Sequence, residues 1–326
     1  MKIISEAGHP DIATVFLAEM DNGKYIEFVE SIQPPIPREE KWVIIVSTLY
    51  GCPVRCTICD AGGWYEGRIS ADHILEQVEY LVNRYFPDHL IPVKKFKIQF
   101  ARMGEPSLNP QVLDVLETLP QRYHAPGLMP SLSTVAPMGT ELFFDRLCHI
   151  KQTHYANGRF QLQFSIHTTD YTLRDQWIPI NKWDFKTIAA FGKRFYKPGD
   201  RKITLNFALS DNSPVSEKVL AEHFDPGMFA IKITPVNPTV SAVLNKISSG
   251  VDVDNPQNEP EIAASLRKLG YDVIVSIGEL EENKIGSNCG QYVKRFLDSE
   301  QSIPGSYGYC LRRPGTPFIK GVPGPP

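Results

Sequence analysis

The sequence lacks the features that define several classes of protein. It has no apolar run of about 18 residues, the length that a membrane-spanning helix requires, and no apolar secretory signal near its start. Its six cysteines in 326 residues are too few for a disulfide-built scaffold. Its net charge of −3 provides no overall positive field to attract nucleic acid. We therefore expect a cytoplasmic protein that does not associate with membranes.

The apolar residues are arranged for an α/β fold. They make up 42% of the chain, which excludes a disordered protein. Short β-branched or aromatic runs alternate with helical segments, as in parallel βα units. The expected strands are Trp42–Ser47, Phe96–Phe100, Ser131–Thr134, Phe160–Ile166, Ile203–Ala208, Ala230–Thr234 and Asp272–Ser276. The expected helices are 71–84, 110–119, 139–150, 182–196, 215–223 and 259–269.

Composition divides the chain into three parts. Residues 1–40 predict a β hairpin, which turns at Asp21-Asn22-Gly23, followed by a proline-rich linker. Residues 41–297 hold the alternating strands and helices and form the expected core domain. Residues 298–326 are rich in proline and glycine, which predicts a flexible tail.

Three of the six cysteines crowd into eight positions. Cys52, Cys56 and Cys59 have the spacing C-x3-C-x2-C directly after an expected strand. A tight loop can direct three thiolates at one metal centre. Structural zinc normally needs a fourth ligand, such as His73 or a distant cysteine. A [4Fe–4S] cluster needs only three protein ligands when one iron is left open to a cosubstrate. Three cysteines on a buried turn, without metal, are the remaining alternative.

The cysteine spacing after the first parallel strand resembles the radical S-adenosylmethionine superfamily. The resemblance implies a partial (βα)6 barrel, here with a short N-terminal β extension. It also implies a [4Fe–4S] cluster on Cys52, Cys56 and Cys59, whose open iron binds the amino and carboxylate groups of S-adenosylmethionine. One electron from the cluster then splits the cosubstrate to a 5′-deoxyadenosyl radical.

Further motifs, in the same order, resemble the RlmN/Cfr family of adenine methyltransferases that act on ribosomal RNA. They are R-M-G-E-P-S-L-N at 102–109, L-S-T at 132–134, S-I-H at 165–167 with R-D and P-I-N-K downstream, and I-T-P-V-N-P at 233–238. In the first motif Arg102 replaces a glycine of the family. The resemblance implies that S-adenosylmethionine is bound by Gly104, Glu105, Ser133, Ser165, Ile166, His167 and Asn237.

Two more residues have catalytic roles by the same resemblance. Cys289, in N-C-G-Q-Y at 288–292, matches a cysteine that carries a methyl group from one S-adenosylmethionine. A radical from a second S-adenosylmethionine removes hydrogen from that methyl, which then adds to an electron-poor ring carbon. Glu27, with Glu30 as the alternative, corresponds to a carboxylate that takes the ring proton at the end of the reaction.

The chain departs from this family at two places. The family's second cysteine, which resolves the covalent adduct, corresponds to Ile45, so Cys148 or Cys310 would have to replace it unless no thiol is needed. Only about 22 residues of hairpin-like sequence precede the linker, too few for the family's RNA-gripping helical module. Basic residues at 94–97 and at 193–202 could still contact phosphates.

The sequence thus predicts a radical S-adenosylmethionine enzyme that methylates an sp2 carbon of an RNA adenine through a methylated cysteine. Its cofactors would be a [4Fe–4S] cluster and S-adenosylmethionine. Its partners would be RNA and an electron donor such as flavodoxin or ferredoxin. One alternative is a radical enzyme that modifies a small molecule or a peptide. Another is a non-catalytic zinc or iron–sulfur binding protein.

Overall fold

One curved sheet organises the computed structural model, which describes residues 1–255, 257–278, 280–287, 292–298 and 311–314. Its ten strands lie in the order β1-β2-β3-β4-β7-β8-β9-β10-β11-β12. The strands are β1 (Lys2–His9), β2 (Ala13–Glu19), β3 (Tyr25–Ser31), β4 (Trp42–Val46), β7 (Phe96–Phe100), β8 (Leu128–Thr134), β9 (Gln161–Ser165), β10 (Ile203–Leu209), β11 (Phe229–Pro235) and β12 (Asp272–Val275). A separate pair, β5 (Leu49–Gly51) and β6 (Tyr65–Arg68), flanks the loop that carries the three cysteines.

The sheet has a parallel and an antiparallel part. Strands β4 and β7 to β12 pair in parallel with one another, and all seven coincide with expected strands. Strands β1 to β4 are antiparallel, so the expected hairpin at β2 and β3 is confirmed but is preceded by a further strand, β1. The sheet is open, with β1 and β12 at its edges. The prediction of an α/β fold with a parallel sheet of this type is therefore confirmed.

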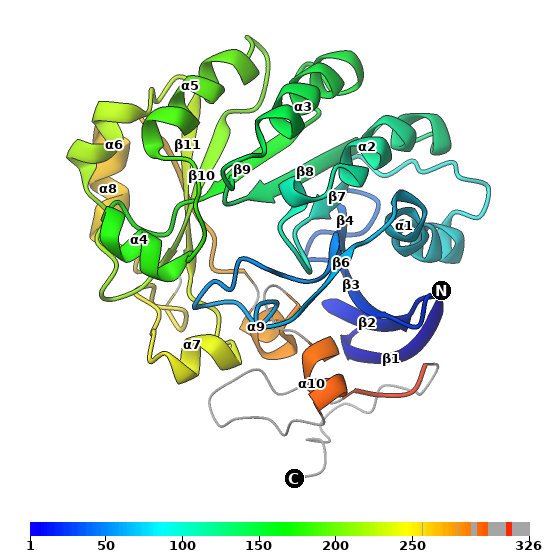
Figure 1. The fold of residues 1–326 in the computed structure, drawn as a ribbon. Coiled ribbons are helices and arrows are strands. Elements are labelled where there is room, and N and C mark those ends of the chain that lie inside the picture. The colour runs from blue at the N-terminus through cyan, green and yellow to red at the C-terminus, as the bar shows by residue number, and fades with distance from the viewer. Residues whose placement is uncertain (256, 279, 288–291, 299–310, 315–326) are drawn as a thin grey trace.

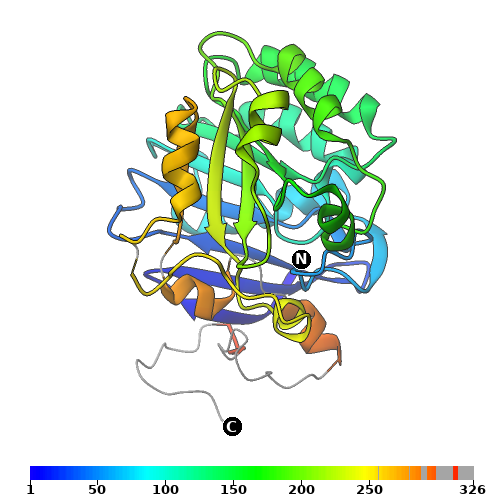
Figure 2. The same ribbon diagram turned by 90° about the vertical axis from the view of Figure 1, so that its left-hand side faces the viewer.

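Helices cover the outer side of the parallel strands (Figure 1). These are α1 (Ala71–Tyr85), α2 (Gln111–Arg122), α3 (Glu141–His154), α5 (Phe185–Phe195), α6 (Glu217–His223) and α8 (Glu261–Lys268). A second view shows β10 and β11 beside α8 (Figure 2). Five short helical segments were not expected: η1 (Pro106–Leu108), α4 (Tyr171–Trp177), α7 (Val240–Leu244), α9 (Leu280–Ile285) and α10 (Tyr292–Asp298).

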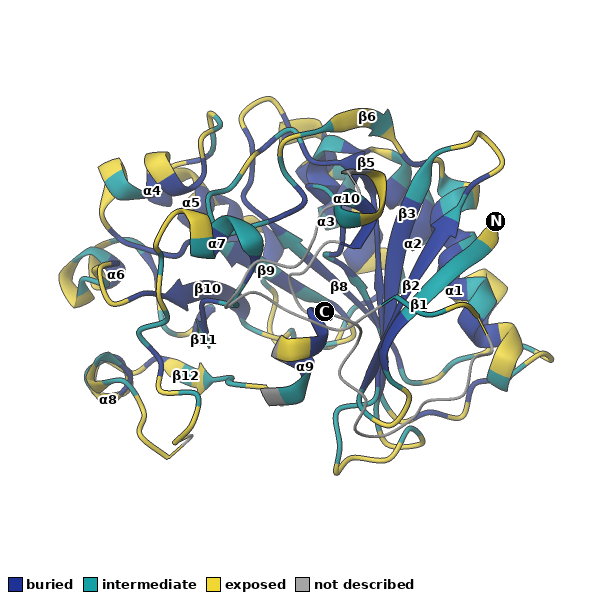
Figure 3. Ribbon diagram, turned by 90° about the horizontal axis from the view of Figure 1, so that it is seen from below, coloured by how far each residue is buried: buried dark blue, intermediate teal, exposed yellow. Residues whose placement is uncertain are grey.

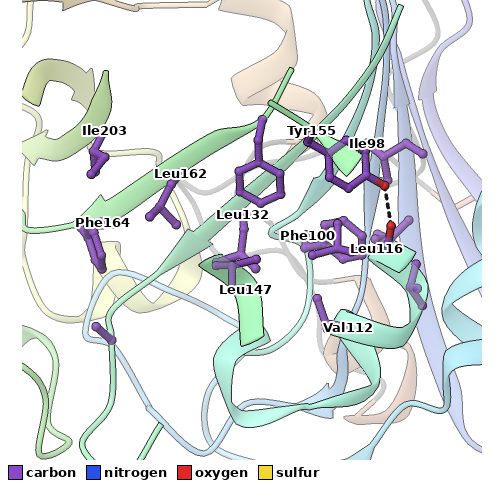
Figure 4. Close-up of a cluster of buried hydrophobic side chains, with 14 of the residues drawn as sticks. Ile98, Phe100, Val112, Leu116, Leu132, Leu147, Tyr155, Leu162, Phe164 and Ile203 are labelled. Carbon is purple, nitrogen blue, oxygen red and sulfur yellow. Dashed lines mark hydrogen bonds between the residues drawn. The ribbon is translucent and has the colours of Figure 1, made fainter. Parts of the chain in front are cut away.

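The main hydrophobic core lies between the sheet and its outer helices. In β7, Phe96, Ile98 and Phe100 are fully buried, whereas the alternate residues face the other side of the sheet. Residues of β7 to β10 meet those of α2 and α3 in this layer (Figure 4). The buried Tyr155 hydroxyl donates a hydrogen bond to the Leu116 carbonyl at 2.5 Å within this layer. Buried strands and exposed outer helix faces are separated clearly when the molecule is seen from below (Figure 3).

The outer edge of the sheet is partly paired. Glu6 in β1 exchanges two backbone hydrogen bonds with Arg312, at 2.8 and 2.7 Å. The Arg312 guanidinium also donates to the Gly8 carbonyl at 2.9 Å. These contacts join the first strand to one of the last described residues. No helix in the described part of the chain is long and apolar enough to cross a membrane.

Candidate active site

A cavity lies on the inner side of the curved sheet. Its volume is about 430 Å³, within the range of sites for small molecules. Residues of β4 and β7 to β11 line it, together with the loop after β5. The predicted site residues that line it are Cys52, Cys56, Cys59, Gly104, Glu105, Ser133, Ser165, His167 and Asn237.

Two other predicted site residues, Ile166 and Glu27, do not line the cavity. Ile166 is fully buried in the main core, and its amide donates to the Asn206 carbonyl at 2.8 Å. Glu27 is fully buried on β3. Cys289 lies outside the residues that the structure describes.

The cysteine loop begins with a turn that only glycine can make. Gly51 has φ +76°, and a Cβ there would lie 2.2 Å from the Trp64 carbonyl oxygen. The Cys52 amide donates to that same carbonyl at 3.0 Å, and the Cys59 amide donates to the Cys56 carbonyl at 3.1 Å. All three thiols are free of disulfides. The turn therefore brings three thiols to one wall of the cavity.

Residues at the start of helix α7 form hydrogen bonds with the C-terminal end of this loop. The Asp60 carboxylate accepts the amide N–H groups of Val240 and Ser241, at 2.9 and 2.7 Å. The Thr239 hydroxyl donates to the Ile58 carbonyl at 3.0 Å. Asp60 thus occupies the N-terminus of α7, where a carboxylate satisfies unpaired N–H groups and interacts favourably with the helix dipole.

Replacing Asp60 by alanine should therefore destabilise the protein and loosen its cysteine loop. Two partly buried N–H groups would lose their acceptor, which we expect to lower the free energy of unfolding by about 1–2 kcal/mol. Urea unfolding of the metal-free protein measures this change. Glu66→Ala, an exposed residue on β6 near the same loop, is the matched control. Equal unfolding midpoints for the two variants would refute the anchoring role of Asp60.

The described residues contain no ready-made site for a single metal ion. Burial raises the pKa of the Cys52 thiol to about 11, and burial followed by the nearby Cys52 raises the pKa of Cys56. Metal binding would therefore release protons. Among the described residues, no three His, Cys, Asp or Glu side chains converge on a single-ion site. Both ring nitrogens of His73, the expected fourth zinc ligand, contact Tyr50 and Asp21 instead.

Glu105 lies beside the cysteine loop with spare hydrogen-bonding capacity. Its Oε1 accepts the amide and hydroxyl of Ser107, at 3.1 and 2.6 Å, and the Thr134 hydroxyl. Its Oε2 accepts the Val135 amide at 2.8 Å. Burial raises the pKa of Glu105, and these hydrogen bonds oppose the rise. Because a carboxylate oxygen has two lone pairs, Oε2 can accept a further hydrogen bond from an ammonium group.

His167 is held as a neutral hydrogen-bond donor. Its Nδ1 accepts the Ala208 amide at 3.1 Å, which leaves the proton on Nε2. Burial, and after it the charge of Arg174, lowers the pKa of His167 to about 4. Its backbone has φ +64°, a conformation uncommon for residues other than glycine. The ring can thus donate to a ligand at neutral pH without carrying a charge.

Asn206 is a cavity residue that the sequence motifs did not indicate. It is 8% exposed, and its side-chain oxygen has no hydrogen-bond partner in the described structure. In the sheet it lies opposite Ser165 of β9 and Lys232 of β11. A buried amide oxygen without a partner is costly, and a ligand can supply the missing donor. The one signal in the sequence was an asparagine in the otherwise apolar middle of β10.

Glu27 forms a buried ion pair with Arg102. The guanidinium Nη2 lies 2.6 Å from the Glu27 Oε1, and both side chains are at most 1% exposed. Arg102 Nη1 also donates to the carbonyls of residues 286 and 287, at 2.9 and 2.6 Å. Glu27 Oε2 accepts the amides of residues 292 and 293, at 2.6 and 2.9 Å. The ion pair therefore forms hydrogen bonds to the backbone on both sides of the segment that contains Cys289.

The described part of the cavity contains no thiol other than the three of the loop. Ile45, where the family has a cysteine, lines the cavity and is 8% exposed. Cys148 lies on α3, half-buried against the main core and away from the cavity lining. Cys310 lies outside the described residues.

Comparison with known proteins supports the resemblance read from the motifs. A protein of Desulfitobacterium hafniense (strain DSM 10664 / DCB-2), named probable dual-specificity RNA methyltransferase RlmN, is 29% identical over 298 residues. The match covers 88% of this chain and 76% of that protein. A protein of the same name from Synechococcus sp. (strain RCC307) is 25% identical over 286 residues, with 84% and 75% covered. No family model matches the chain.

A solved structure agrees on the fold. A radical SAM methyltransferase from Sphaerobacter thermophilus superimposes with a TM-score of 0.69 and 20% identity, covering 89% of this chain and 80% of that one. Together with the two relatives, it confirms the expected resemblance to RlmN-type proteins. The prediction of an enzyme of the radical S-adenosylmethionine methyltransferase type is likewise confirmed.

Proposed function

We propose that this radical S-adenosylmethionine methyltransferase adds a methyl group to an sp2 carbon of an adenine in RNA. One observation carries the proposal: three free thiols and nearly all the side chains expected to bind S-adenosylmethionine meet in one cavity. The names of the two relatives supply the substrate class, since both are RNA methyltransferases by name.

Different residues around the cavity would bind the cluster and the separate groups of S-adenosylmethionine. Cys52, Cys56 and Cys59 would hold a [4Fe–4S] cluster, which when bound supplies the electron that cleaves S-adenosylmethionine. Glu105 would accept a hydrogen bond from the ammonium group of the cosubstrate through the second lone pair of its Oε2. His167 would donate from its neutral ring, because its low pKa keeps it uncharged. Asn237, which also lines the cavity, would bind the adenine or ribose.

Cys289 would carry the methyl group, and the Glu27–Arg102 ion pair would position it. The pair fixes the chain three residues before Cys289 and again three residues after it. Both carboxylate oxygens of Glu27 are already engaged, one by Arg102 and one by two amides. Glu27 is thus better placed to position the carrier segment than to take the ring proton that the family resemblance assigned to it.

Mass spectrometry of protein isolated from a host replete in S-adenosylmethionine tests the carrier mechanism. We expect a methyl group on Cys289, and no methylated cysteine in Cys289→Ala. Cys148→Ala is the matched control and should retain the methyl group, because this residue lies away from the cavity. An unmethylated Cys289 under turnover conditions would overturn the mechanism.

A second candidate acceptor is a small molecule or a peptide. The net charge of −3 favours it, because an overall negative charge weakens the general attraction to RNA. Methyl transfer that continues after ribonuclease treatment, and that does not depend on salt, would identify this alternative. Transfer that requires RNA and falls as salt rises would identify RNA.

A further inference from the structure

Three lysines point to a second function of the cavity. Lys41 directly precedes β4, Lys97 is the second residue of β7, and Lys232 lies in the middle of β11. All three line the cavity that holds the cysteine loop. Strands of a parallel sheet that is covered on both faces are usually apolar throughout, so inward-facing lysines need a reason.

Lys97 is the least compensated of these charges. It has no hydrogen-bond or ion-pair partner among the described residues. Burial lowers its pKa well below the usual range, and the charges of Lys232, Lys95, Lys41 and Arg201 lower it further, in that order. Except for Lys95, these residues are far from Lys97 in the sequence, and the fold brings their charges close enough to act on it. A cation that others repel in this way is stabilised by a bound anion.

The two acidic residues that line the described cavity do not pair with Lys97. Glu105 accepts hydrogen bonds near the cysteine loop from Ser107, Thr134 and Val135. Glu282 accepts the Ser31 hydroxyl at 2.6 Å, and its charge acts on Lys41. The charge of Lys97 is therefore left for a bound anion to stabilise.

Asn206 is an independent sign of a ligand at this place. It is more than nine-tenths buried, and its side-chain oxygen has no partner in the described chain. On the neighbouring strand β11, Lys232 is its register partner. An amide oxygen only accepts hydrogen bonds, so the ligand group that satisfies it is a donor such as a hydroxyl or amino group.

We propose that Lys41, Lys97 and Lys232 bind a phosphate group of the acceptor substrate inside the cavity, while the Asn206 oxygen accepts a hydrogen bond from a hydroxyl or amino group of the same molecule. Lysines bind phosphate as point charges, and several of them suit its multiple negative charge better than a single carboxylate. Lys41 and Lys97 lie near the amino ends of β4 and β7, whereas the cysteine loop and Glu105 follow the carboxyl ends of these strands. The acceptor would thus extend from the cysteines along the sheet. The inference rests on the proposed function in one respect, that this cavity receives the acceptor.

Calorimetric titration of the reconstituted enzyme with adenosine and with adenosine 5′-monophosphate tests the proposal, because the two probes differ only in the phosphate. We expect the monophosphate to bind about tenfold more tightly or better. Lys97→Met should abolish this difference and leave adenosine binding unchanged. Lys218→Met, an exposed lysine on α6, should preserve the difference. Because Lys97→Met removes a repelled charge, it should fold, and an undiminished melting temperature verifies this.

A third probe identifies the source of the phosphate. An adenine-containing oligoribonucleotide that binds more tightly than the monophosphate, and loses this advantage in Lys97→Met, assigns the site to the RNA backbone. Preference for the monophosphate assigns it to a phosphorylated small molecule. Equal binding of adenosine and both phosphate-bearing probes overturns the site. Cys289 methylation is measured separately, so failure of the phosphate site and failure of the methyl-carrier mechanism remain distinguishable.

Discussion

Replacing Cys56 by alanine is expected to eliminate iron–sulfur cluster binding and all cleavage of S-adenosylmethionine. The wild-type protein, reconstituted without oxygen, should contain about four iron and four sulfide per chain, and the variant close to none. The described lining of the cavity offers no fourth thiol to replace the lost one. Iron and sulfide assays, together with the visible absorption of the cluster, measure the result before any activity is tested.

Cys148→Ala is the control for this experiment. Cys148 is also a free thiol, but it lies on α3 against the main core and does not line the cavity. Its removal should leave the iron content unchanged. If the wild-type protein instead takes up one zinc ion and no sulfide, the cluster assignment fails and the zinc alternative is supported.

Replacing Arg102 by methionine should destabilise the protein more than Asp60→Ala, because a fully buried charge loses its partner. The Glu27 carboxylate would remain buried without its cation, and breaking a buried pair in this way costs about 3–5 kcal/mol. Denaturant unfolding at neutral pH measures the loss. Glu27→Gln combined with Arg102→Met removes both charges and should recover much of the stability. If the double variant is as unstable as Arg102→Met alone, the ion pair is not the source of the effect.

The cost of Arg102→Met should depend on pH in a defined direction. Burial raises the pKa of Glu27, and Arg102 is the charge that most opposes this rise. Without Arg102 the folded-state pKa must lie further above the unfolded value near 4.5. Between the unfolded and the folded pKa the folded state binds more protons, so stability falls as the pH rises through this interval. The variant should therefore be closest to wild type below pH 4.5 and most impaired above the raised pKa.

The sequence was sufficient for the local parts of the site. The cysteine loop could be recognised because its three cysteines lie within eight residues, and Glu105 and His167 because each lies in a motif that resembles the family's. The seven parallel strands could be predicted because each is a short apolar run between helical segments. In these cases the residues that act together are close in the chain or follow a repeated pattern.

The other parts of the site, the lysine cluster and the Glu27–Arg102 pair, consist of residues that only the fold brings together. The lysine cluster combines positions 41, 97 and 232 from three strands, and none of them is distinctive in its own segment. The Glu27–Arg102 pair joins β3 to the loop after β7 and to both sides of the Cys289 segment. Arg102 was visible only as a departure from the family's glycine. Its partner could not be inferred, because no periodicity or spacing connects positions 27 and 102.

The pairing of β1 with Arg312 has a consequence for how the protein is made. Glu6 in β1 leaves the ribosome 306 residues ahead of Arg312, whose backbone groups pair with it, since 312 − 6 = 306. At about 5–20 residues per second, this interval is roughly 15–60 s. During that time the outer edge of β1 offers unpaired N–H and C=O groups to neighbouring nascent chains, a known route to aggregation. Overexpression should therefore yield insoluble protein most readily when synthesis is slow or chaperones are scarce.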